Sequence, residues 1–142
     1  MPSTFVKYNC FVENLAEKVH NLASDTLKVA LTNTAPNAAT HALLGDIGEI
    51  AGGNGYTAGG NQTTQSSSSQ TGGVYTLASA DPATWTASGG SIGPFRYAVL
   101  YNATPTSPLK PLIGYWDYGS SITLNEGETF TVDLGASTLT LT

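Results

Sequence analysis

Two apolar stretches, residues 95–101 and 112–118, constrain the fold of this chain more than any other feature. In the first, aromatic and β-branched residues recur at every second position, and this period predicts a strand. The second stretch has the same period, and prolines at 105, 108 and 111 disfavour a helical connection between the two. We therefore predict an antiparallel hairpin at the centre of an all-β domain. Strict alternation defines one face of each strand: Phe95, Tyr97, Val99 and Tyr101 in the first, and Leu112, Gly114, Trp116 and Tyr118 in the second.

The remaining sequence predicts further short strands and one short helix. Phe11, Leu15 and Val19 recur every four residues, which favours an amphipathic helix near the N-terminus. Between the predicted strands, segment 38–50 is expected to plug the core as a loop with a short helical or extended piece. The polar tract 61–73 is expected to be either an edge strand or a surface loop. Together, these elements predict an antiparallel β-sandwich or barrel with one short N-terminal helix. Further strands are predicted at 27–32, 74–78, 83–87, 122–124, 128–134 and 138–142.

The composition favours a neutral structural protein over a free enzyme. At 142 residues the chain is expected to form a single β domain, residues 1–142. Charged residues make up 11% of the chain, well under the usual ~25%, so uncharged polar residues must cover its surface. The net charge of -5 excludes nucleic acid from the expected partners, and no stretch approaches the ~18 apolar residues of a membrane span. The N-terminus has no pattern typical of a signal peptide, so we expect synthesis inside a cell.

Residue types that perform nucleophilic chemistry are few. His20 and His41 accompany no Gly-x-Ser-x-Gly elbow, and we expect both to be exposed or locally hydrogen-bonded. The lone Cys10 is expected to be a small apolar filler. The glycines of segment 51–60 precede neither a Lys nor a good helix former, so we interpret them as backbone freedom rather than a phosphate-binding loop. We expect no catalytic residue, no cofactor and no enzyme activity.

Two pairs of carboxylates are close enough in sequence to contribute to a metal site. They are Asp46 with Glu49, and Glu126 with Glu128. A Ca²⁺ ion needs roughly six to eight oxygen ligands, and the sequence has no Asp-x-Asp-x-Asp loop to supply them. Solvated turn charges are the favoured interpretation, and metal binding by either pair stays open.

The aromatic residues are candidates for a contact surface. Core packing is the first interpretation, a subunit interface the second and a sugar-stacking platform the third. Residues 1–11 are a candidate contact arm, because a short strand before a weak helix can add to a neighbour's sheet. Deleting this arm is expected to leave the fold intact. The candidate interface residues are Phe5, Tyr8, Phe11, Tyr97, Tyr101, Tyr115, Trp116 and Tyr118.

Four stretches resemble a family of small virion structural proteins of tailed bacteriophages. They are TLKVALTNTAP (26–36), EIAGGNGYTAGG (49–60), WTASGGSIGPFRYAVLY (85–101) and IGYWDYGSS (113–121). The resemblance extends from Phe5 to Val132. It implies a virion structural protein encoded among head and tail genes, and it implies no catalytic residues.

Size, β architecture and this resemblance lead to one expected function and one alternative. We expect a capsid decoration or cement protein that binds the major capsid protein lattice or other virion proteins as a homo-oligomer, with a trimer favoured. Such a protein is made in the host cytoplasm and located in the virion. The alternative is a tail or fibre-tip component that binds a host receptor or glycan. A third hypothesis, a virion-associated glycan hydrolase, predicts turnover that depends on Asp46, Glu49 or Asp117.

Overall fold

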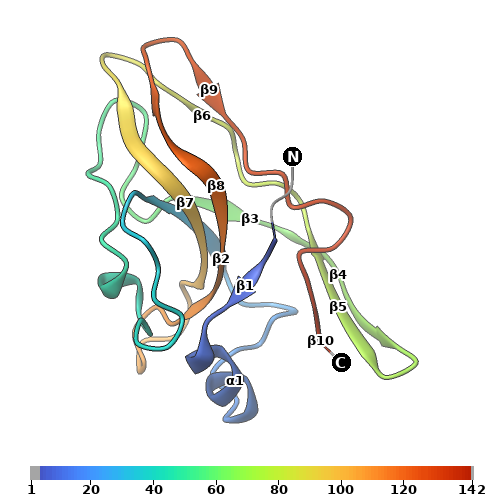
Figure 1. Cartoon of the computed structure of the whole chain (residues 1–142). Coiled ribbons are helices and arrows are strands. Elements are labelled where there is room, and N and C mark those ends of the chain that lie inside the picture. Colours follow the sequence, from blue (N-terminus) through green and yellow to red (C-terminus); the bar gives the residue numbers. More distant parts are fainter. Residues whose placement is uncertain (1–3, 142) are drawn as a thin grey trace.

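The computed structural model describes residues 4–141, and antiparallel strands dominate it (Figure 1). Strands account for 45% of the structure and helix for 8%, which confirms the predicted all-β fold with one short N-terminal helix. In chain order the elements are β1 (Val6–Lys7), α1 (Asn9–Ala16), β2 (Leu27–Thr32), the 3₁₀ helix η1 (Leu44–Asp46), β3 (Asn61–Thr63), β4 (Gln65–Thr71), β5 (Val74–Ser79), β6 (Trp85–Thr86), β7 (Ile92–Asn102), β8 (Leu112–Leu124), β9 (Thr129–Phe130) and β10 (Leu139–Leu141).

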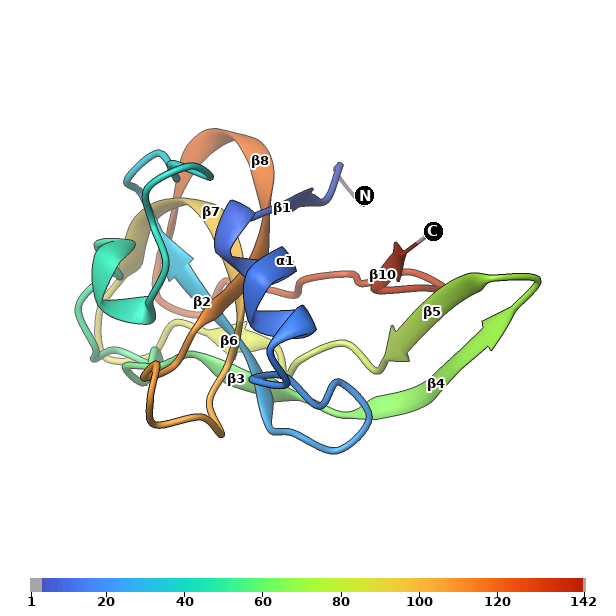
Figure 2. The ribbon, with the colours of Figure 1, turned by 90° about the horizontal axis from the view of Figure 1, so that it is seen from below.

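The strands form three antiparallel sheets. The largest has the order β1-β8-β7-β2-β3, the second β10-β5-β4, and the third pairs β6 with β9. In residues 4–141 the largest sheet ends at β1 and β3, so it is open rather than closed into a barrel. Only Thr64 separates β3 from β4, and the chain therefore passes from the first sheet into the second in one extended segment. Figure 2 shows the β4–β5 hairpin projecting away from the rest of the molecule.

The large sheet is buried on both faces. On one face, β2 and β7 contribute Val29, Leu31 and Leu100 to a cluster that also holds Trp85 and Val132 from the smaller elements. The opposite face carries a second cluster. Burial on both faces explains why β2 is nearly continuous in apolar residues rather than alternating. The second cluster consists of Tyr8, Ala30, Ile47, Val99, Tyr101 and Leu112.

Irregular pairing between β7 and β8 changes which side chains share a face. The register shifts on both sides of Phe95, and Phe95 packs with Leu100 rather than with Val99 and Tyr101 as alternation predicts. A shift between Leu100 and Tyr101 likewise places Ile113 with Trp116 and Leu112 on the other face. These facing assignments from the sequence are wrong, because a bulge inserts a residue and reverses the alternation beyond it.

The N-terminal segment is part of the folded core. The Phe5 ring lies 5.2 Å from the Trp116 ring, Tyr8 and Phe11 are fully buried, and β1 pairs with β8. Residues 4–11 are therefore part of the fold, and this packing contradicts the expectation that the segment can be deleted with the fold intact. Contact of this segment with a partner stays a prediction, and residues 1–3 lie outside the described residues. Helix α1 ends earlier than the predicted 11–19, and Lys18 just beyond it has a φ of 67°.

Segments 38–50 and 51–60 pack against the large sheet, where Ile47 joins the cluster that holds Tyr101 and Tyr56 joins the cluster on the opposite face. Ile47 is fully buried and follows η1, as expected for a core plug. Tyr56 donates to Glu49 Oε2 (2.5 Å) and accepts from the Leu31 amide (3.0 Å), while Tyr101 donates to the Gly59 carbonyl (2.6 Å). These bonds fix the glycine-rich segment against β2 and β7.

Candidate interaction surface

The structure divides the predicted interface residues into core and surface. Tyr8, Phe11 and Tyr101 are at most 1% exposed, and Trp116 is 9% exposed. These four are core residues in the single chain, because β7 and β8 are covered on both faces. The residues that keep accessible surface are Phe5, Tyr97, Tyr115 and Tyr118.

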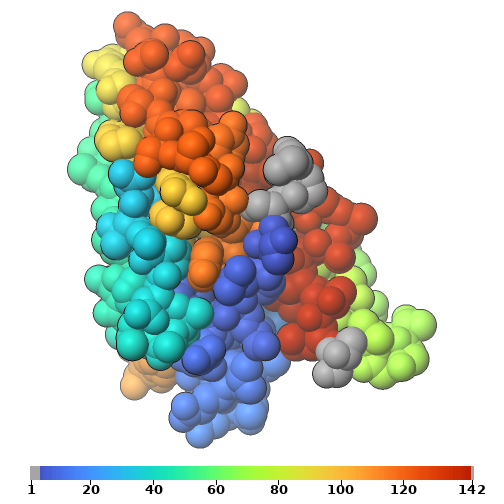
Figure 3. Space-filling view, in the orientation of Figure 1, coloured from blue at the N-terminus to red at the C-terminus, as the bar shows by residue number. Residues whose placement is uncertain are grey.

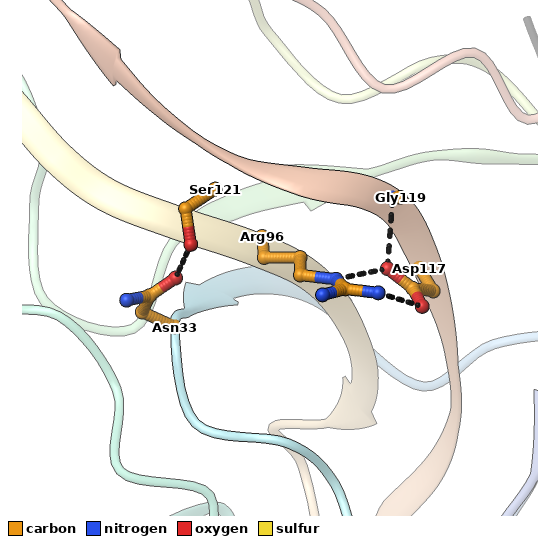
Figure 4. A network of polar contacts seen from close by, with 5 residues as sticks. All are labelled: Asn33, Arg96, Asp117, Gly119 and Ser121. Atoms are coloured by element: carbon orange, nitrogen blue, oxygen red, sulfur yellow. Dashed lines mark hydrogen bonds and ion pairs between the residues drawn. The ribbon is translucent and has the colours of Figure 1, made fainter.

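Arg96 and Asp117 form an ion pair between β7 and β8 and are the sequence neighbours of Tyr97 and Tyr118 (Figure 4). Arg96 donates from Nε to Asp117 Oδ1 (2.8 Å) and from a terminal guanidinium nitrogen to Oδ2 (3.1 Å). The Gly119 amide also donates to Oδ1 (2.8 Å). The Arg96 hydrogen bond and the Gly119 amide lower the pKa of Asp117, so the pair is ionised at neutral pH. Both side chains stay partly exposed, so the pair positions groups more than it stabilises the fold.

A groove lies on the side of the sheet where the N-terminal segment meets β8. We call it the tyrosine groove, and its volume is about 500 Å³. Tyr97 and Tyr115 meet edge to face with ring centroids 6.4 Å apart, and Tyr115 also contacts the buried Tyr8 ring at 5.5 Å. In Figure 3 the blue N-terminal segment, the cyan segment after β2 and orange β8 meet on this face. The groove is lined by Thr4, Val6, Ala35, Pro36, Tyr97, Tyr115 and Asp117.

A smaller recess lies between β7, β8 and β9, and we call it the aromatic recess. Its volume is about 70 Å³. Tyr118, which is 56% exposed, meets Phe130 edge to face at 5.8 Å, and Phe130 meets Phe95 in the same way at 5.0 Å. Arg96 and Asp133 contribute polar groups to its lining. The recess therefore combines an exposed aromatic ring with hydrogen-bonding groups.

The four predicted carboxylates each accept hydrogen bonds from the protein. Asp46 accepts from the Ala42 and Leu43 amides, which lowers its pKa, and Glu49 accepts from Tyr56 and the Gly59 amide. Residues 4–141 contain no group of three or more His, Cys, Asp or Glu that could hold a metal ion.

Glu126 and Glu128, the second carboxylate pair, also accept hydrogen bonds from backbone amides. Glu126 accepts from the Gly89 amide (3.0 Å), and Glu128 from the Asn125 amide (2.7 Å). These contacts organise the turns at the end of the β7–β8 hairpin. They agree with the favoured interpretation of turn charges. The Glu128 bond lies within one turn, whereas the Glu126 bond joins two turns that are distant in sequence.

His20 is neither exposed nor locally hydrogen-bonded as expected, because it is only 6% exposed and its partner is distant in sequence. Its Nδ1 lies 3.1 Å from the Asn102 amide nitrogen, which also donates to Asp25 Oδ2 (2.6 Å). Burial lowers the pKa of His20 to about 4, so the ring is neutral at physiological pH. His41 is locally hydrogen-bonded as expected, since its Nδ1 accepts from the Asn37 amide (3.2 Å).

Sequence reasoning placed Arg96 on a strand without assigning it to the candidate surface. The available signal was the opposite charge of Arg96 and Asp117 on two strands predicted to pair, since such cross-strand pairs are favourable.

None of the helical segments in residues 4–141 has the length and apolar character that crossing a bilayer requires. Comparison of the chain with models of known protein families, with curated proteins and with solved structures gives no match.

Proposed function

We propose that this chain is a structural protein of a bacteriophage virion, a decoration or cement protein that binds the major capsid protein lattice. The observation that carries the proposal is the tyrosine groove. It presents three partly exposed residues, Tyr97, Tyr115 and Pro36, beside the exposed Val6. Tyrosine is enriched at the energetic centres of protein interfaces because one ring buries a large area and keeps a polar end.

The groove is also held in place before any partner arrives. Tyr115 rests on buried Tyr8, and Asp117 at the rim is fixed by Arg96. A preorganised surface loses little conformational entropy on binding, which favours affinity for a given area. A low-charge β framework and the resemblance to phage virion proteins support the same proposal. Many copies on a lattice, arranged as trimers, would add avidity, and the protein would reach the virion after synthesis in the host cytoplasm.

Capsid binding by single-site variants tests the proposal. Purified protein is added to particles that lack it, from the phage whose genome encodes the chain, and bound protein is measured by co-sedimentation. Val6→Lys places a charge in the groove and is expected to reduce occupancy at least tenfold. Val12→Lys on α1 is the matched control, because Val12 is 54% exposed and lies outside the groove lining. Full occupancy by Val6→Lys contradicts the groove, and absence of the protein from cryo-EM maps of complete particles contradicts the function.

The aromatic recess supports the alternative, a tail or fibre-tip component that binds a host receptor or glycan. Tyr118 is 56% exposed and lines this recess together with Arg96, so an apolar ring face and a hydrogen-bond donor are available to a sugar. Binding on a glycan array that Tyr118→Ala abolishes would favour this function. Trp116→Ala is unsuitable for the test because Trp116 is a core residue. That the protein is not an enzyme stays a prediction.

A further inference from the structure

Strand β4 presents an open backbone edge on the outside of the molecule. It is the last strand of the β10-β5-β4 sheet, and residues 66–71 are all exposed. Its pairing with β5 is regular from Ser67↔Ala78 to Thr71↔Val74. The hairpin projects into solvent (Figure 2), so the backbone N–H and C=O groups of alternate β4 residues face outward, and no strand of residues 4–141 lies beside them.

This edge lacks the features by which proteins usually prevent strand-to-strand association. Charged side chains, prolines and covering segments are the common protections. Residues 61–80 contain no charged residue, no histidine and no proline, and the one bulge in β4 lies at its base, between Gln65 and Ser67. The regular part of β4 is therefore open to pairing.

Three other strand edges in residues 4–141, those of β3, β1 and the outer part of β8, are covered, short or interrupted. The β3 edge is covered by the segment after β5, since Asn61 Nδ2 donates to the Ala83 carbonyl (2.7 Å) and Thr63 Oγ1 to the Ala80 carbonyl (2.5 Å). Strand β1 has two residues, one of which is Lys7. The outer part of β8 is interrupted by Gly119, whose φ is 103°. Compared with these edges, β4 is longer than β1 and β3, is regularly paired along residues 67–71, and carries no charged side chain.

The hairpin is held in its strand geometry by its own side chains. Gln65 Nε2 donates to the Leu22 carbonyl (3.0 Å) and the Asp25 carbonyl (2.7 Å), which anchors the base of β4 to the loop after α1. Ser68 and Tyr75 share a hydrogen bond across the hairpin (2.8 Å). At the tip, the two-residue turn Gly72-Gly73 has positive φ at both positions, 59° and 87°, as a tight hairpin turn requires. The edge therefore needs no reordering before it pairs.

We propose that β4 pairs antiparallel with β4 of a second copy of this chain, about a two-fold axis perpendicular to the sheet. The pairing joins two three-stranded sheets into one continuous sheet across the dimer. A two-fold axis places the β4 edge against the same edge of the second copy, so any charge on β4 would meet a like charge. The chain carries a net charge of -5, yet residues 50–80 contain no charged side chain, which removes this repulsion at β4. A second copy is therefore the occupant that the edge fits best.

The contact is expected to be weak in solution, with a Kd in the range of about 1 μM to 1 mM, because a single strand pair forms few bonds and association costs entropy. It is independent of the proposed function: the tyrosine groove and β4 share no residue, and capsid binding by monomers would leave the pairing proposal unaffected.

Disulfide trapping tests the pairing directly. Cysteines are introduced singly at each of residues 66–70 in a Cys10→Ser background, and disulfide-linked dimers are quantified after mild oxidation. About a perpendicular two-fold axis, one β4 residue faces its own counterpart while its neighbours in sequence do not. Because a disulfide needs Cα atoms about 4.4–6.8 Å apart, we expect one position of high yield flanked by positions of low yield. Yields no higher than that of Val12→Cys on the exposed face of α1, or equal yields at all five positions, would overturn the proposal.

A charge variant provides the second readout. Ser67→Lys with Ser69→Lys adds like charges at the edge and is expected to weaken the dimer at least tenfold in sedimentation equilibrium of the otherwise native chain. Both serines are exposed, so circular dichroism should show an unchanged fold. Ser120→Lys with Thr123→Lys on exposed positions of β8 is the matched control, and it should dimerise like the native chain. A dimer that survives the β4 charges refutes the pairing.

Discussion

Replacing Phe5 with alanine tests whether the N-terminal segment is part of the fold. The Phe5 ring packs on Trp116 at 5.2 Å and covers Gly114, where an added Cβ would lie 2.2 Å from the ring. Complete loss of a buried phenylalanine costs about 3–5 kcal/mol, and because Phe5 is only half-buried we expect about 2 kcal/mol. The measurement is urea unfolding followed by tryptophan fluorescence. Val12→Ala is the control, since an exposed helix position should change the free energy of unfolding by less than ~0.5 kcal/mol.

The same contact can be perturbed from the other side. Gly114→Ala would place its Cβ 2.2 Å from the Phe5 ring and 2.8 Å from the Val6 carbonyl oxygen, so we expect a loss of about 1–3 kcal/mol. In the Phe5→Ala background the clash with the ring disappears and the backbone contact remains. The double variant should therefore be about 1 kcal/mol more stable than the sum of the single losses predicts. Strictly additive losses, or Phe5→Ala as stable as the native chain, would show that residues 4–7 form a free arm after all.

Three further predictions concern the interior. Gly60→Ala, at φ 76°, places a Cβ 1.8 Å from the Val29 carbonyl oxygen and should cost about 2–4 kcal/mol in thermal unfolding, against about 1 kcal/mol for Gly72→Ala, which meets no atom within 4 Å. Tyr56→Phe leaves a buried amide without its acceptor and should cost about 2 kcal/mol in urea unfolding. Because the folded-state pKa of His20 is about 4 against 6.5 in the unfolded chain, the unfolded state binds more protons between these values. Stability should be full above pH 6.5 and fall by roughly 3 kcal/mol towards pH 4, with roughly 2 kcal/mol of this lost by pH 5. His20→Gln should remove that part of the slope in denaturation measured at pH 7 and pH 5.

The sequence predicted those features of the fold that depend on neighbouring residues. Alternation identified the strands of the central hairpin, and it placed Trp85, Val132 and Leu134 inward, as the structure confirms. The pleat of a strand imposes this period locally, so it can be read without knowledge of the rest of the fold. The polar tract 61–73 also forms an edge strand, one of the two predicted alternatives.

Features that depend on distant segments could not be predicted. A bulge has no reliable sequence signature, yet the bulges around Phe95 and Ile113 decide which face each side chain occupies. Tyr8 and Tyr101 are amphipathic aromatic residues that also occur at surfaces. They are buried because residues from distant segments, Ile47 and Leu44 among them, pack with them on one face of the large sheet. The Arg96–Asp117 pair required the strand register as well as the opposite charges.

The residues whose hydrogen bonds stabilise the fold are different from the residues that line the tyrosine groove, so stability and capsid binding can be perturbed separately. Tyr56 and Tyr101 hold the glycine-rich segment to the sheet through hydroxyl groups, and neither contributes to the lining of the tyrosine groove. Tyr56→Phe should therefore lower the free energy of unfolding and leave capsid occupancy unchanged below the unfolding transition. Val6→Lys should do the opposite, because Val6 is exposed on a two-residue edge strand. If binding instead followed stability across both variants, occupancy would report the amount of folded protein and the groove would lose its role as the contact surface.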